Sequence, residues 1–164
     1  MKAIQMTGVG GPEVLEIAEI ETPEPGDGQV LIKVTATSVN RADISQRRGN
    51  YPPPKGDSEI LGLEVTGIVE KLGPGVGNCV SGDRVMSLVG VGGYAEYALA
   101  YASHLIPVPD CLTDEEAACV AETYITAYLN IFDVAGLNDG EIVLLHGGGG
   151  GVNTAGIQLC KQLR

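Results

Sequence analysis

The stretch Glu141-Ile-Val-Leu-Leu-His146 is followed directly by five glycines, residues 147–151, and then by a run with helical composition over 152–163. A short, continuous apolar segment bounded by turn residues is typical of a buried strand in a parallel sheet. Strand, glycine-rich turn and helix in this order predict the first half of a βαβ unit. The neighbouring parallel strand is reached only through a completed crossover, so we expect it to be missing here.

The glycine run itself predicts a phosphate site. A backbone without side chains approaches a phosphate closely, and the amides of the following helix point at the anion. The fingerprint Gly-x-Gly-x-x-Gly is matched only in part, because its sixth place holds Val152 in the frame from Gly147 and Asn153 in the frame from Gly148. Asn153 is unexpected where a third glycine would let helix and strand pack closely. A flexible glycine linker is the alternative interpretation.

The first 110 residues contain short β-rich runs separated by glycine and proline turns, which predict an all-β barrel or sandwich. A short helix is expected over 41–48, ended by Gly49 and the prolines at 52–54. The predicted strands cover 1–6, 14–21, 30–39, 65–72, 84–89, 94–99 and 104–108.

The pattern changes near Thr113, which forms a capping-box pair with Glu116. Helices are predicted from there on, including a run over 123–134 that stops at Gly136. The four cysteines are widely spaced, with no Cys-x-x-Cys pair. Cys119 and Cys160 lie in apolar helical stretches, where a buried thiol is the usual outcome, and we expect no structural zinc site.

Charge and hydropathy exclude two classes of partner. The net charge of -11 opposes binding to phosphate backbones and anionic lipid. No apolar run reaches the roughly 20 residues needed to span a bilayer, and residues 1–6 read as a strand with no leader pattern. We therefore expect a cytoplasmic protein that binds neither nucleic acid nor membrane.

Several separated blocks, in register over the whole chain, resemble zeta-crystallin-like quinone oxidoreductases, a zinc-free, NADPH-dependent branch of the medium-chain dehydrogenase/reductase superfamily. These blocks are Gly10-Gly-Pro-Glu-Val-Leu15, Ser38-Val-Asn-Arg-Ala-Asp43, Leu61-Gly-Leu-Glu-Val-Thr-Gly67, Gly82-Asp-Arg-Val85, Gly92-Gly-Tyr-Ala-Glu-Tyr97 and His146-Gly-Gly. The resemblance implies a mainly β GroES-like barrel followed by the incomplete start of an α/β Rossmann domain.

The resemblance also implies domain limits. Residues 1–120 would be the GroES-like catalytic domain, and residues 121–164 the truncated start of the Rossmann nucleotide-binding domain. About half of the family's chain would be absent, including the residues that select the coenzyme's 2′-phosphate and a terminal segment that returns to the catalytic domain. We therefore expect this portion to be inactive alone.

Metal ligands of the superfamily's zinc enzymes are not matched. A cysteine and a Gly-His-Glu segment provide ligands where this chain has Asn40 and Gly62-Leu-Glu64. An amide and Leu63 do not suit zinc, which prefers thiolate, imidazole and carboxylate. Glu64 alone does not hold a catalytic metal, and its alternative role is a strand residue in a polar network.

By resemblance, Asn40 and Asp43 line the cleft beside the nicotinamide, with Asn40 as a neutral hydrogen-bond donor, and Tyr51 contacts substrate or donates a proton. Asn40 and Asp43 are alternatively a capping pair of the helix over 41–48. Tyr51 is alternatively an aromatic plug before the prolines.

Cofactor contacts implied by the resemblance lie further along the chain. Thr126 would contact NADPH. Its alternative role is that of a helix threonine whose hydroxyl bonds its own backbone. Gly150, Gly151 and Val152 would offer backbone amides to the pyrophosphate. His146 is more typical of a packed strand end than of a general base.

The predicted activity is hydride transfer from NADPH to a quinone or related activated enone, by a protein that is a homodimer when full length. An enoyl reductase is a related enzymatic alternative. A non-catalytic, crystallin-like binding or structural protein is the alternative from another class.

Overall fold

The computed structural model of the chain describes residues 1–53 and 58–163. Pro54, the last of the prolines predicted to end the first helix, lies outside these residues. The chain divides into two compact units, Met1–Cys119 and Val120–Arg164, and each is described by itself. Over the described residues, no helix is both long and apolar enough to cross a bilayer.

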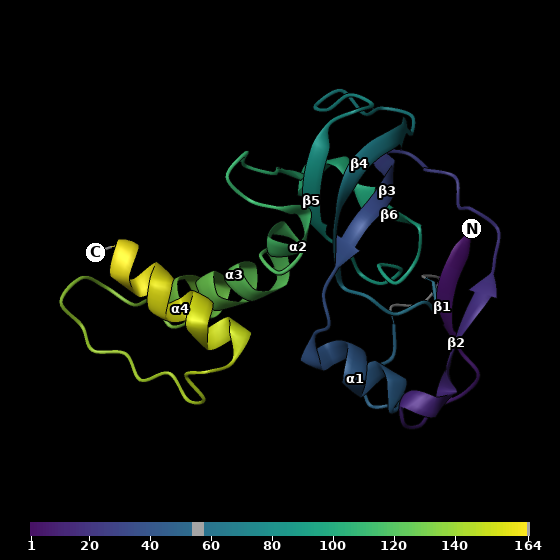
Figure 1. Ribbon diagram of the computed structural model, residues 1–164. Coiled ribbons are helices and arrows are strands. Elements are labelled where there is room, and N and C mark those ends of the chain that lie inside the picture. Colours follow the sequence, from purple (N-terminus) through teal and green to yellow (C-terminus); the bar gives the residue numbers. More distant parts are fainter. Residues whose placement is uncertain (54–57, 164) are drawn as a thin grey trace. The chain divides into compact units, whose positions relative to one another are not determined.

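A five-stranded antiparallel sheet forms the centre of the first unit (Figure 1). Its strand order is β6-β3-β4-β5-β7, and a separate antiparallel pair, β1-β2, precedes it in sequence. The strands are β1 (Lys2–Met6), β2 (Leu15–Glu19), β3 (Gln29–Thr37), β4 (Glu64–Leu72), β5 (Arg84–Leu88), β6 (Tyr97–Tyr101) and β7 (Ile106–Pro107). The predicted mainly β architecture is confirmed, and the ladders among the described residues run from β6 to β7 without closing.

Alternating apolar residues of these strands form the core. Val30 and Ile32 of β3 and Val65 and Val69 of β4 are fully buried and pack with Val85 of β5. Their spacing follows from the two-residue period of a strand, which sends alternate side chains to one face. Burial of this face fixes β3 and β4, and the candidate site lies next to the end of β3 and the start of β4.

Short helical segments connect the strands. The 3-10 turns η1 (Pro12–Val14) and η2 (Ala102–His104) precede β2 and β7, and α1 (Arg41–Arg47) follows β3. At α2 (Asp114–Ala117), Thr113 Oγ1 accepts from Glu116 N at 3.2 Å and Thr113 N donates to Glu116 Oε2 at 2.9 Å. This reciprocal pair confirms the predicted capping box.

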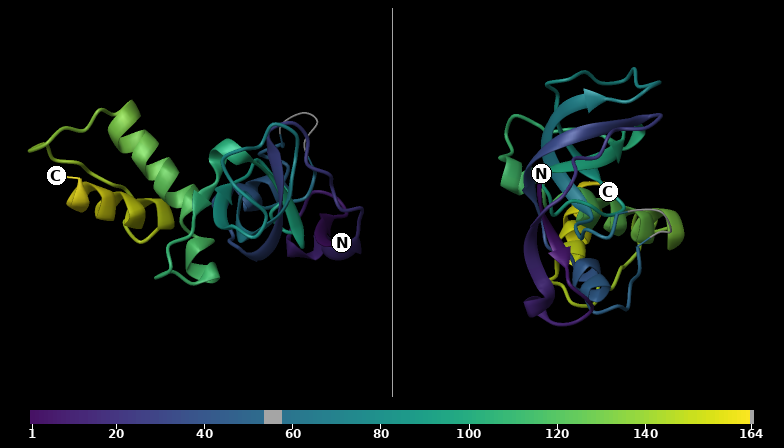
Figure 2. Two further views of the ribbon diagram at one scale, coloured as in Figure 1. Left: turned by 90° about the horizontal axis from the view of Figure 1, so that it is seen from above. Right: turned by 90° about the vertical axis from the view of Figure 1, so that its right-hand side faces the viewer.

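The second unit consists of helices and one long connection. It contains α3 (Ala121–Tyr128), a π-helical turn η3 (Leu129–Val134) and α4 (Gly151–Gln162). Figure 2 shows α3 and α4 side by side, with the connection between them extending beyond their ends. Their small cluster contains Ala127, Ile131, Ala155 and Cys160.

The predicted buried strand over 141–146 is wrong for this chain. Residues 141–145 form no ladder with any described residue, and Ile142 is 98% and Leu144 77% exposed. Val143 and Leu145, on the other face, pack against the cluster between α3 and α4. The alternation of a strand is therefore present, but hydrogen bonding along a strand requires a neighbour that this segment does not have here.

The two cysteines predicted to be buried differ in their exposure to solvent. Cys160 is buried in the α3–α4 cluster, as expected. Cys119 is exposed, contrary to the prediction, because it lies at the end of unit 1 just after α2 and not inside a longer helix.

A test of the sheet's packing uses Gly67 of β4. A Cβ at Gly67 would overlap the Lys33 carbonyl oxygen and lie 2.8 Å from Ile32 Cγ2, whereas a Cβ at Gly77 would meet nothing within 4 Å. We expect Gly67→Ala to lower the free energy of unfolding by about 2 kcal/mol or more, and Gly77→Ala, the matched control, to change it by less than about 1 kcal/mol. Urea denaturation measures both, and equal effects would contradict the packing described.

Candidate functional site

The carboxylate of Asp43 is the centre of a polar network in the first unit. Its side chain lies in the first turn of α1 and is only 2% exposed. Oδ2 accepts from Asn40 N at 2.7 Å and from the Tyr94 hydroxyl at 3.1 Å, and Oδ1 accepts from Gly62 N at 3.1 Å. Three donors from three segments thus compensate the burial of a charged group.

Gly62 is required at its position in this network. Its φ of +104° is a conformation that L side chains rarely adopt. A Cβ there would lie 2.6 Å from Tyr94 N and 2.7 Å from Gly93 C. The absence of a side chain therefore lets the Gly62 amide point at Asp43 while residues 93–94 pass directly alongside.

Burial raises the pKa of the Tyr94 hydroxyl well above its usual value, and the charge of Asp43 and the hydrogen bond to it add to the increase. Tyr94 therefore remains a proton-bearing donor over the ordinary pH range. In this position it stabilises the carboxylate of Asp43.

Asn40 belongs to a second group of contacts around Glu64. Asn40 Nδ2 donates to Ser38 Oγ at 3.0 Å and to Glu64 Oε1 at 2.9 Å. The Ser38 hydroxyl in turn donates to the same Glu64 oxygen, and Thr37 Oγ1 donates to the Glu64 backbone oxygen at 2.7 Å. Glu64 is 1% exposed, so it lies in a buried polar network, the alternative role expected for it.

The structure brings Asn40 and Asp43 together as a capping box at the start of α1. Tyr51, the third residue predicted to be catalytic, is 52% exposed in the segment after α1. Its role in contacting substrate stays a prediction, as do the catalytic roles of Asn40 and Asp43.

The predicted cofactor residues lie in the second unit. α4 begins at Gly151, with Gly150 as its N-cap and Val152 in its first turn. A Cβ at Gly148 or Gly149 would meet nothing within 4 Å, so the turn is open on that side. An open glycine turn before a helix of this length fits the pyrophosphate of a dinucleotide.

Thr126 lies in α3. Its hydroxyl donates to Glu122 Oε1 at 3.4 Å, one helical turn earlier, and not to the backbone as the alternative interpretation had it. Its predicted contact with NADPH stays a prediction.

Asn153 supports the glycine turn instead of disrupting it. Its Nδ2 donates to His146 O at 2.7 Å and to Gly147 O at 3.0 Å. The close approach for which a fingerprint glycine is needed occurs at Gly156, where a Cβ would lie 2.9 Å from Ile131 Cδ1 and 3.1 Å from Leu145 Cδ1. The polar side chain at 153 is therefore compatible with the packing of α4.

Sequence reasoning missed the roles of Gly62 and Tyr94. Both lie inside blocks on which the family resemblance rests, Leu61–Gly67 and Gly92–Tyr97. That location was the only available signal, because nothing local in either block indicates a contact with Asp43.

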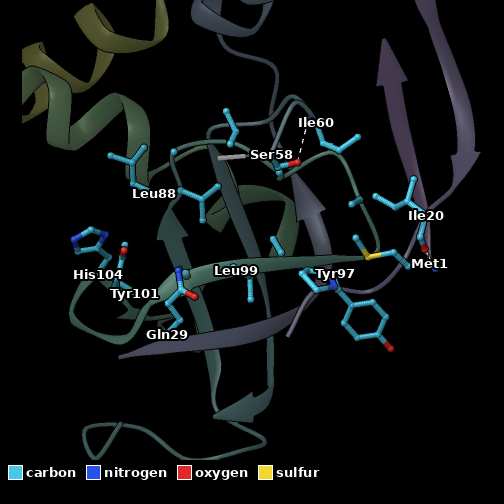
Figure 3. Close-up of a pocket in the computed structure, with 18 of the residues that line it drawn as sticks. Met1, Ile20, Gln29, Ser58, Ile60, Leu88, Tyr97, Leu99, Tyr101 and His104 are labelled. Atoms are coloured by element: carbon cyan, nitrogen blue, oxygen red, sulfur yellow. Dashed lines mark hydrogen bonds between the residues drawn. The ribbon is translucent and has the colours of Figure 1, made fainter. Parts of the chain in front are cut away.

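A separate cavity of about 620 Å³ lies in the first unit, between the ends of β1 and β2 and the strand β6 (Figure 3). Apolar side chains form much of its lining, including Met1, Ile20, Ile60, Leu88 and Leu99. Asn40, Asp43 and Tyr51 do not line it. The Asp43 network, and not this cavity, coincides with the predicted site.

No group of three or more His, Cys, Asp and Glu side chains suited to a metal ion occurs in the part of the chain that the structure describes. Around Asn40, the Glu64 carboxylate, the Ser38 hydroxyl and the Asn40 amide already bond one another. The Asp43 carboxylate is engaged separately, by two backbone amides and the Tyr94 hydroxyl. Of these groups, only the two carboxylates are of the kind that zinc prefers in proteins.

Comparison with known proteins identifies the family. Residues 26–110 match the alcohol dehydrogenase GroES-like domain. The chain belongs to this family, and the predicted GroES-like fold is confirmed.

The similarity extends to nearly the whole chain. A quinone oxidoreductase of Sus scrofa is 40% identical over 163 residues, 98% of this chain and 50% of the relative. The human synaptic vesicle membrane protein VAT-1 homolog-like protein has a crystal structure that matches with a TM-score of 0.91 and 39% identity, over 98% of this chain and 52% of that one. A mycobacterial protein complexed with NADPH matches with a TM-score of 0.88 and 39% identity, over 98% and 50%.

These relatives confirm the resemblance to quinone oxidoreductases of the medium-chain dehydrogenase/reductase superfamily. The chain spans about half of their length or less, down to 39% for the curated human VAT-1 homolog-like sequence.

The raised pKa of Tyr94 predicts a pH dependence. The unfolded chain releases this proton near the usual value of 10.0, whereas the folded chain holds it to higher pH. The contribution of Tyr94 to stability is therefore complete below that value and is lost as pH rises above it. We expect the free energy of unfolding to fall more steeply above pH ~10 in the wild type than in Tyr94→Phe.

Urea denaturation across this pH range measures the difference. Asp43→Asn should reduce the steepness without abolishing it, because burial is the larger cause of the shift. Identical slopes for the wild type and Tyr94→Phe would contradict the described environment of the hydroxyl.

Proposed function

We propose that the complete protein transfers hydride from NADPH to a quinone or a related activated enone without zinc. The observation that carries this proposal is the match to quinone oxidoreductases, which runs through both the Asn40–Asp43 network and the glycine turn. A structural relative is described as complexed with NADPH, which supports the choice of coenzyme.

The acceptor's own chemistry supports a metal-free reaction. Oxidation of an alcohol requires removal of a hydroxyl proton, which a Lewis acid makes feasible near neutral pH. A quinone needs no such help, because its conjugated carbonyls accept hydride directly and a proton then completes the hydroquinone. Positioning, a proton donor and exclusion of water suffice. The donor set around Asn40, which does not suit zinc, agrees with this chemistry.

Each unit has a distinct proposed role. Residues 1–120 form the catalytic domain, in which Asn40 and Asp43 line the site and Tyr51 contacts the substrate or donates the proton. Residues 121–164 begin the nucleotide-binding domain, in which Thr126, Gly150 and the amides of Gly151 and Val152 hold the coenzyme. The Gly150 N–H itself donates to Gly147 O at 2.8 Å. When bound, the nicotinamide supplies the hydride.

The same proposal includes the partners, the oligomeric state and the compartment of the complete protein. The partners are small molecules, with no nucleic acid or membrane, and the complete protein is a homodimer in the cytoplasm. The acidic charge of the chain supports the exclusion of nucleic acid, because phosphate binding requires an excess of Lys and Arg.

Activity of the protein from the complete reading frame tests the proposal. We expect NADPH oxidation to depend on an added quinone and to persist after treatment with a chelator, because no step requires a Lewis acid. Absorbance at the NADPH band measures the rate, with a saturated alcohol plus NADP⁺ as the control reaction that should not proceed. No turnover at saturating quinone would contradict the enzymatic function, and restoration by zinc alone would contradict the metal-free mechanism. Turnover of enoyl thioesters in preference to quinones would favour an enoyl reductase.

A non-catalytic binding or structural role is the second candidate. The VAT-1 homologs to which the chain is 35–38% identical have names that state no reaction. Coenzyme affinity separates the two candidates, since a purely structural protein has none.

Fluorescence quenching by NADPH measures this affinity. We expect clear binding by the complete protein and weak or no binding by the 164-residue chain, because one strand segment and one helix do not form a whole dinucleotide site. Tight NADPH binding by the 164-residue chain would contradict the expectation that this chain lacks a whole dinucleotide site. If the complete protein does not bind NADPH, the structural role is favoured.

A further inference from the structure

The side chain of Asn153 connects α4 to the start of the glycine turn. Asn153 is the third residue of the helix, and its Nδ2 donates to His146 O at 2.7 Å and to Gly147 O at 3.0 Å. A carbonyl oxygen only accepts hydrogen bonds, so the nitrogen of the side-chain amide faces these two groups. The bonds reach back seven and six residues along the chain, across the whole turn.

Thr154 makes corresponding contacts with the second half of the turn. Its Oγ1 donates to Gly150 O at 3.0 Å and lies 3.5 Å from Gly148 O. Its backbone N–H also donates to Gly150 O, at 2.8 Å, and Gly150 N donates to Gly147 O at 2.8 Å. The carbonyl groups of the turn are therefore bonded mainly by Asn153 and Thr154.

These bonds give the turn a one-sided polarity. The carbonyl oxygens of His146, Gly147 and Gly150 accept hydrogen bonds, whereas the backbone N–H groups of Gly148 and Gly149 donate to no residue that the structure describes. An anion is attracted by N–H groups and repelled by carbonyl oxygens. A turn with bonded carbonyl oxygens and available N–H groups has the polarity that a pyrophosphate requires.

Five consecutive glycines are costly to hold in one conformation. Glycine loses more conformational freedom on ordering than any other residue. A Cβ at Gly148 or Gly149 would meet nothing within 4 Å, so close packing does not fix these two residues. A ligand that requires one conformation of the turn binds more tightly when other contacts have already ordered it.

The dinucleotide fingerprint favours glycine at position 153 because a side chain there would separate helix from strand. In this chain the close approach occurs at Gly156, where a Cβ would lie 2.9 Å from Ile131 Cδ1. A glycine at 153 would therefore leave this close approach unchanged and would remove both bonds to the start of the turn.

We infer that Asn153 is a positioning residue, which orders the five-glycine turn for the coenzyme by holding the carbonyl groups of His146 and Gly147. The fingerprint glycine at this position would then weaken coenzyme binding in this protein instead of improving it. The inference rests on the proposed function for the identity of the ligand, NADPH.

Coenzyme affinity of the complete protein tests the inference. We expect Asn153→Gly to weaken NADPH binding about fivefold to tenfold, the loss typical of one or two hydrogen bonds. Asn138→Gly is the matched control, because Asn138 Nδ2 also donates to a backbone carbonyl, Gly136 O at 2.8 Å, but outside the turn, and its affinity should stay within about twofold of the wild type. Fluorescence quenching measures all three proteins. Equal or tighter binding by Asn153→Gly would overturn the inference.

A double-mutant cycle shows whether Asn153 acts through the order of the turn. Alanine fits at Gly148, whose φ is not in the left-handed region and where a Cβ meets nothing within 4 Å. Alanine has less conformational freedom than glycine, so the turn of Gly148→Ala depends less on Asn153. We expect Asn153→Gly to weaken NADPH binding only about twofold in the Gly148→Ala background. The same loss in both backgrounds would show that Asn153 acts by another route, and would overturn the inference.

Mobility of the turn provides a test without coenzyme. In the ¹⁵N-labelled 164-residue chain, we expect order parameters of about 0.8 for the N–H groups of Gly148 and Gly149, and below about 0.6 in Asn153→Gly. Unchanged order parameters would overturn the inference. If the complete wild-type protein does not bind NADPH, the proposed function fails, and the order parameters still decide whether Asn153 orders the turn.

Discussion

The buried carboxylate of Asp43 is the group on which the candidate site depends. Donors reach it from the start of α1, from the turn before β4 and from the loop before β6. A buried charge is tolerated only when hydrogen bonds replace its lost hydration. Because these donors come from distant parts of the sequence, satisfying one carboxylate sets the relative positions of three segments and places Asn40 beside Glu64.

The segment over 141–145 in the second unit shows the opposite situation, because only one of its two faces is covered by other residues. Val143 and Leu145 pack inward, while Ile142 and Leu144 face outward and are largely exposed. A parallel strand is normally covered on both faces and hydrogen-bonded on its edges. The glycine turn nevertheless keeps an open form, because Asn153 ties the carbonyl groups at its start to α4.

Local patterns predicted the elements well where both partners lie close in sequence. The capping box at Thr113 was predictable because its two residues are three positions apart, and the strands of the sheet followed from their two-residue period. The strand predicted over 94–99 begins instead at Tyr97. Residues 92–94 donate to the backbone of residues 60–62 and not to a ladder, a pairing that no local signal reveals.

The sequence by itself determined the strands of the sheet, the glycine turn and the family, because side-chain periodicity, capping and separated motifs are properties of the chain. Only the tertiary structure decided that Asp43 is buried, that the Tyr94 hydroxyl donates to it, and that the side-chain amide of Asn40 bonds Glu64. The paired groups lie far apart in the chain, Tyr94 51 positions from Asp43 and Glu64 24 positions from Asn40, so no local pattern brings them together.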